Sequence, residues 1–113
     1  ITPEGQSWYV SAGQGMGACL NIANEQQAYV LSDKATFLKN KSNLSSLSIL
    51  LESADDMKNT YSLIAVSPDK YPDENYEGAQ AFIKWMTSDK AQKLITSYGV
   101  KDYGEQLFYW IDK

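Results

Sequence analysis

The segment from Gly13 to Gly17 places three glycines at alternate positions, immediately before an apolar pattern of helical spacing. The apolar residues that recur at i, i+3, i+4 and i+7 are Met16, Cys19, Leu20 and Ala23. This spacing predicts a helix that opens out of the turn and runs to about Gln27. Glycine allows backbone angles that are closed to other residues, so the pattern constrains this part of the chain to a tight turn followed by a helix.

A helix that begins in this way can receive an anion. Its first backbone N–H groups have no partner within the helix, the peptide dipoles place about half a positive charge there, and glycine leaves the amides uncovered. The spacing is not that of a dinucleotide-binding loop, and no Gly-Lys-Ser/Thr completes a nucleotide phosphate loop. A purely structural turn is the alternative interpretation.

A second group of polar residues follows the apolar segment 28–31. Ser32, Asp33 and Lys34 supply a hydroxyl, a carboxylate and an ammonium directly after this expected strand. Ligands of α/β proteins lie beyond the carboxyl ends of strands, which makes the position a candidate for binding. The alternative is that Ser32 or Asp33 caps a short helix and that Lys34 is solvated. Capping suits Asp33 better, because its carboxylate would repel an anion.

The rest of the chain alternates expected strands and helices. Apolar runs predict strands at 28–31, 47–51 and 61–66. Besides the helix after the glycines, helices are expected around Phe37 and Leu38, from a cap at Asn75 to Met86, and from a cap at Ser88 or Asp89 to Gly99. Residues 39–43 are expected to form a loop, 53–59 a turn and 103–110 an extended aromatic tail. The alternation predicts an α/β fold, and the length predicts a single domain, 1–113.

Composition excludes several classes of function. The ten cations are all lysines, scattered singly against fourteen acidic residues, so there is no basic stripe for nucleic acid. The chain has no histidine and one cysteine, Cys19, which excludes His/Cys zinc sites and histidine-based catalysis. Cys19 lies on the apolar helix face and is expected to be buried and inert. Asp55 and Asp56 lack the further oxygen ligands of a calcium loop. These features predict a binding module without metal or cofactor rather than an enzyme.

Several segments together resemble a known family, the tungstate-binding proteins of ABC importers. They are Trp8-Tyr9, Gly13-Gln14-Gly15-Met16-Gly17, Ala23-Asn24-Glu25, the segment 28–38, and Tyr103-Gly104-x-x-Leu107-Phe108. The resemblance covers essentially the whole chain. Its most specific parts are the Gly-Gln-Gly-Met-Gly turn and the Ala-Tyr-x-Leu-Ser-Asp segment that begins at Ala28.

The resemblance implies a two-lobed, type II periplasmic-binding-protein-like fold whose lobes close on a tetrahedral oxyanion, tungstate or molybdate. It implies that the chain is the C-terminal portion, with 1–60 in the ligand-side lobe and 61–113 forming a crossing strand and helices that return to the first lobe. The Thr-Thr-Thr-Ser turn of the family's first lobe, and the Ser-Arg…Ser-Gly-Thr segment that supplies an arginine to the ligand, are not found here. Carried over by position, the ligand-binding residues are Gly15, Met16, Gly17, Ser32 and Lys34.

The implied function is that of a solute-binding component of an ABC importer. Its partner is the permease, and its location is periplasmic or extracellular, with membrane association in the full-length form. Two positions depart from the family pattern: Val30 stands where threonine is common, and Lys34 where arginine is common. The alternative is therefore a ligand-sensing or protein-interaction domain that kept the fold and lost the oxyanion. We also expect self-association of the chain, because half of such a protein exposes a face that its missing sheet covers.

Overall fold

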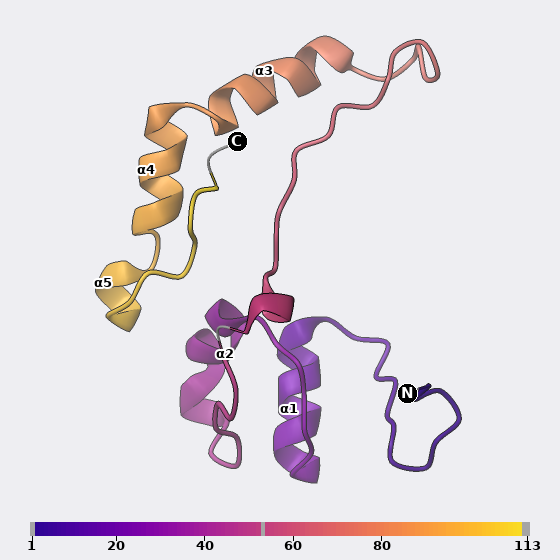
Figure 1. The fold of residues 1–113 in the computed structure, drawn as a ribbon, viewed down its shortest axis with the longest axis vertical. Coiled ribbons are helices and arrows are strands. Elements are labelled where there is room, and N and C mark those ends of the chain that lie inside the picture. The colour runs from indigo at the N-terminus through magenta and orange to yellow at the C-terminus, as the bar shows by residue number, and fades with distance from the viewer. Residues whose placement is uncertain (1, 53, 112–113) are drawn as a thin grey trace. The chain divides into compact units, whose positions relative to one another are not determined.

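The computed structural model describes residues 2–52 and 54–111, and its helices are connected by extended segments (Figure 1). The chain divides into two compact units, Ile1–Met57 and Lys58–Lys113.

The first unit contains the predicted helix after the glycine turn. Helix α1 spans Met16–Gln26, and the chain leaves it through Gln27 in the left-handed conformation, with φ of 51°. Helix α2 spans Lys34–Asn40, and the Asp33 side chain caps it by accepting a hydrogen bond from the Thr36 amide at 2.8 Å. The predicted start and end of α1 and the predicted cap of α2 are confirmed.

The core of the first unit lies where α1 and α2 meet. Leu20 of α1, Phe37 of α2 and Leu44 form a buried cluster, and Leu38 and Leu47 pack against it. The Asn24 side chain on α1 also accepts a hydrogen bond from the Ser46 amide at 2.9 Å, which ties the segment after α2 to α1. Figure 1 shows α1 and α2 side by side and running in the same direction, so their N-terminal ends lie toward the same end of the unit.

The second unit is built from three helices, α3 at Tyr76–Met86, α4 at Asp89–Ser97 and α5 at Val100–Tyr103. Asn75 and Ser88 cap α3 and α4 through their side chains, as the sequence predicts. Gly99 separates α4 from α5, as the N-cap of α5 in the left-handed conformation with φ of 72°. The Phe108 ring, in the tail, packs between Tyr98 and Tyr61 at centroid distances of 6.1 and 6.5 Å.

The expected strands are not formed in the part of the chain that the structure describes. The segments 28–31, 47–51 and 61–66 have no strand assignment, so the β half of the predicted α/β fold is not observed in residues 2–52 and 54–111. A strand exists only when a neighbour takes its hydrogen bonds, and no ladder joins these segments to one another. Most of their apolar side chains are correspondingly open to solvent, with Tyr29 92% and Ile64 86% exposed, whereas Leu47 packs against the core.

Two expected loops contain short helical turns instead. The polar stretch 39–43 continues α2 to Asn40 and then forms the 3₁₀ helix η1, Lys41–Asn43. A second 3₁₀ helix, η2, spans Asp55–Met57 within the expected turn 53–59, of which Ser53 lies outside the described residues. Among the residues described, no helix has both the length and the apolar character that crossing a membrane requires.

Candidate functional site

The N-terminus of α1 is open, in contrast to those of α2, α3 and α4. Its N-cap is Gly15, which has no side chain to accept a hydrogen bond, and the first turn of α1 carries no acidic residue. Helices α2, α3 and α4 are each capped by a side chain, those of Asp33, Asn75 and Ser88. The first amides of α1 therefore keep the partial positive charge that a cap would offset.

The backbone conformation accounts for only one of the three glycines of this turn. Gly13 has φ of 59°, a left-handed conformation that favours glycine. Gly15 has an ordinary extended conformation with φ of −69°, and Gly17 lies within α1. A Cβ added at Gly15 or Gly17 would meet no described atom of the chain within 4 Å. Neither backbone angle nor crowding within the described chain calls for glycine at these two positions, whereas close approach of another group to the amides would.

Cys19 contributes to this turn. Its thiol lies 3.4 Å from the carbonyl oxygen of Gln14, to which it donates, and its side chain is half-buried. The expectation of a buried thiol was wrong, because only Leu20 and Ala23 of the apolar face are covered within the unit. The contact links the helix back to the glycine turn.

Ser32 and Lys34 lie at the start of α2. The half-buried Ser32 donates through Oγ to the carbonyl oxygen of Asp33 at 3.0 Å. The Lys34 ammonium forms an ion pair with Glu52, with Nζ and Oε2 2.9 Å apart. Glu52 was missed by the sequence reasoning, because an ion pair between residues so far apart in the chain leaves no local pattern.

The structure thus places the five predicted residues in one unit, at two helix starts that point the same way. Gly15, Met16 and Gly17 form the start of α1, and Ser32 and Lys34 flank the cap of α2 (Figure 1). The two starts differ in charge. That of α1 presents bare amides, whereas that of α2 already holds the Asp33 carboxylate and the Lys34–Glu52 pair.

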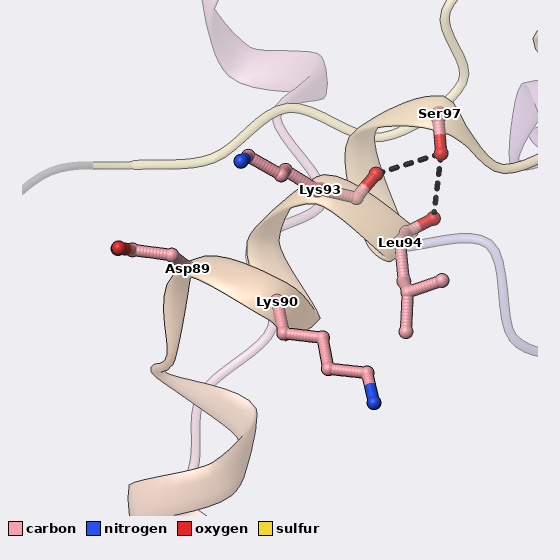
Figure 2. A pocket seen from close by; sticks show the side chains of 5 residues that line it. All are labelled: Asp89, Lys90, Lys93, Leu94 and Ser97. Atoms are coloured by element: carbon pink, nitrogen blue, oxygen red, sulfur yellow. Dashed lines mark hydrogen bonds between the residues drawn. The ribbon is translucent and has the colours of Figure 1, made fainter.

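The second unit has a shallow hollow of its own, on α4. Figure 2 shows that one helix supplies all the residues that line it, Asp89, Lys90, Lys93, Leu94 and Ser97. The Ser97 hydroxyl is used within the helix, at 2.7 Å from the Lys93 carbonyl oxygen. The Lys90 and Lys93 side chains point in different directions, so the hollow does not converge on a ligand.

The sequence matches a known protein family. Residues 2–90 match the family described as PBP superfamily domain. The chain belongs to this superfamily. The match supports a periplasmic-binding-protein-like fold for the PBP superfamily chain, and it includes both helix starts of the candidate site.

Relatives of this PBP superfamily chain are named for anion binding. The chain is 49% identical, over 96% of its length, to the tungstate-binding protein TupA of Peptoclostridium acidaminophilum. It is 42% identical, over 85% of its length, to the tungstate-binding protein TupA of Campylobacter jejuni. It is also 39% identical, over 96% of its length, to a Haloferax volcanii protein named as an anion-binding protein of an ABC transporter.

The matches cover only part of these relatives. The chain spans 37% of the length of each tungstate-binding protein and 32% of the Haloferax protein. No solved structure matches the chain significantly.

Proposed function

We propose that this chain is the C-terminal portion of an extracytoplasmic solute-binding component of an ABC importer. The bound solute is a tetrahedral oxyanion, tungstate or molybdate, held in a cleft between two lobes. Residues 1–60 supply the ligand-side wall, and 61–113 supply a crossing strand and helices that return to the other lobe. The similarity to tungstate-binding proteins supports the ligand class.

The observation that carries the proposal is the open start of α1. An oxyanion needs hydrogen-bond donors in place of its water shell, and uncapped helix amides supply donors together with a favourable dipole. Gly15 and Gly17, which no described neighbour crowds, allow an anion to approach the amides of Gly15, Met16 and Gly17 directly. Ser32 and Lys34 complete the wall from the parallel start of α2.

The proposed role involves binding without chemistry. Closure of the two lobes around the oxyanion couples ligand binding to recognition by the permease. The location is periplasmic or extracellular, with the full-length protein held at the membrane. The extended apolar segments 28–31 and 61–66, which are exposed here, join sheets when the other parts of the protein supply their neighbouring strands.

Isothermal titration calorimetry of the full-length protein tests this function. We expect one tungstate ion to bind per protein, and molybdate to compete for the same site. Phosphate, which is also tetrahedral but protonated near neutral pH, serves as the comparison anion. Absence of heat with both tungstate and molybdate would contradict the proposal and favour the sensing or interaction domain.

A further inference from the structure

The ion pair at the start of α2 joins two segments that the sequence does not connect. Lys34 is the first residue of α2, whereas Glu52 follows η1 at the end of the segment 44–52. The separation of 2.9 Å between Nζ and Oε2 is that of a charge-assisted hydrogen bond. The two side chains are 38% and 52% exposed, so water and small solutes reach both partners.

Lys34 is also the cation best placed to meet an anion in the first unit. Residues 1–57 contain three lysines: Lys34, Lys39 and Lys41. Lys39 lies in the last turn of α2, and Lys41 begins η1, so both lie at the opposite end of the helix from Lys34. Lys34 opens α2, whose start lies at the same end of the unit as the start of α1 (Figure 1).

We propose that Glu52 is an internal competitor of the oxyanion for the Lys34 ammonium. The carboxylate of Glu52 holds that ammonium in the unliganded protein and gives it up to the ligand, so Glu52 lowers the affinity of the site and Lys34 raises it. This inference rests on the proposed function. An exposed ion pair is weak enough for a dianion to displace.

The test is Glu52→Gln in the full-length protein, titrated with tungstate in about 0.15 M salt, where distant charges are screened. Release of Lys34 raises the affinity by roughly threefold to fivefold, the upper part of the range of about 1.4-fold to fivefold that an exposed ion pair contributes. In a Lys34→Met background the same Glu52 substitution changes the affinity by less than about twofold, because there is no ammonium to release.

Glu25→Gln is the matched control. It removes the same charge from an exposed glutamate near the end of α1, about 14 Å along the helix from its start. We expect its effect to stay below about twofold. Weaker binding by Glu52→Gln would overturn the inference, because Glu52 would then be positioning Lys34 for the ligand. An equal gain in tungstate affinity in Glu25→Gln, or a gain that persists in the Lys34→Met background, would also overturn the inference. The effect of Glu52 would then come from its negative charge in general and not from competition for Lys34.

The titration also separates this inference from the function on which it rests. Failure of the unsubstituted protein to bind tungstate contradicts the proposed function. Binding that Glu52→Gln leaves unchanged keeps the function and rejects the competition.

Discussion

Replacement of Gly17 by alanine should raise the stability of the protein and lower its affinity for tungstate. Gly17 is the second residue of α1, has no left-handed angle, and would present a Cβ that meets no described atom within 4 Å. Alanine at such a position stabilises a fold by about 0.4–1 kcal/mol, through the entropy of the unfolded chain and helix propensity. For a protein of a few hundred residues this raises the melting temperature by about 1–4 °C.

The same methyl group lies where the proposed oxyanion approaches the backbone. Loss of one hydrogen bond to a charged ligand costs about 1.5–3 kcal/mol, which corresponds to roughly 10- to 150-fold in the dissociation constant for tungstate. Scanning calorimetry of the ligand-free full-length protein measures the first effect, and titration with tungstate the second. A raised melting temperature with unchanged affinity would show that the turn is only structural and would refute the reasoning.

Gly78→Ala is the matched control for this substitution. A Cβ at Gly78, in α3, would lie 2.7 Å from Nδ2 of Asn75, the side chain that caps the helix. The same chemical change should therefore destabilise the protein, by about 1 kcal/mol if the cap is lost. It should leave tungstate affinity unchanged. A loss of affinity comparable to that of Gly17→Ala would mean that the Gly17 effect is not local to the turn.

Three further predictions follow from single contacts and from exposed surface. Asp33→Ala removes the cap of α2 and should cost about 1 kcal/mol in urea unfolding of the full-length protein; no loss would show that the Thr36 amide finds another partner. Gly99→Ala should cost about 1–2 kcal/mol in the same assay, because φ is 72° and the new Cβ would lie 2.9 Å from Leu107. The isolated chain should bind tungstate weakly and should self-associate through its exposed apolar segments. Tight tungstate binding by this chain alone, or a monomeric mass in light scattering at micromolar concentration, would contradict the proposal that the chain supplies only one wall of the binding site.

Helices α1 to α4 were predictable because their signals are local, whereas α5 at Val100–Tyr103 was not predicted. The apolar spacing that begins at Met16 and the caps at Asp33, Asn75 and Ser88 all act within one or two helical turns, and the structure contains each of them. Strands were not predictable in the same way. An apolar run such as 61–66 becomes a strand only when a neighbouring strand takes its hydrogen bonds, and the sequence pattern of the run does not show whether such a neighbour is present. The same dependence explains Cys19, whose helix face is covered only in part.

The candidate site was predictable to the same extent. The open start of α1 follows from Gly15 at the cap position, which the glycine pattern indicated. The partner of Lys34 did not follow from any sequence pattern, because the fold of the chain brings Glu52 to Lys34, and the two residues are not related by helical spacing. The sequence thus indicated the amides that we propose bind an anion, and the structure added Glu52, the carboxylate that we propose competes with that anion.

Anomalous scattering from tungsten in crystals of the full-length protein grown with tungstate tests the central claim most directly. Tungsten is located by its own signal, independently of any assumption about the site. The account predicts one strong peak at the start of α1, with tungstate oxygens within about 2.7–3.2 Å of the backbone nitrogens of Met16 and Gly17. A tungsten peak remote from this turn, with these amides facing solvent or protein instead, would contradict it.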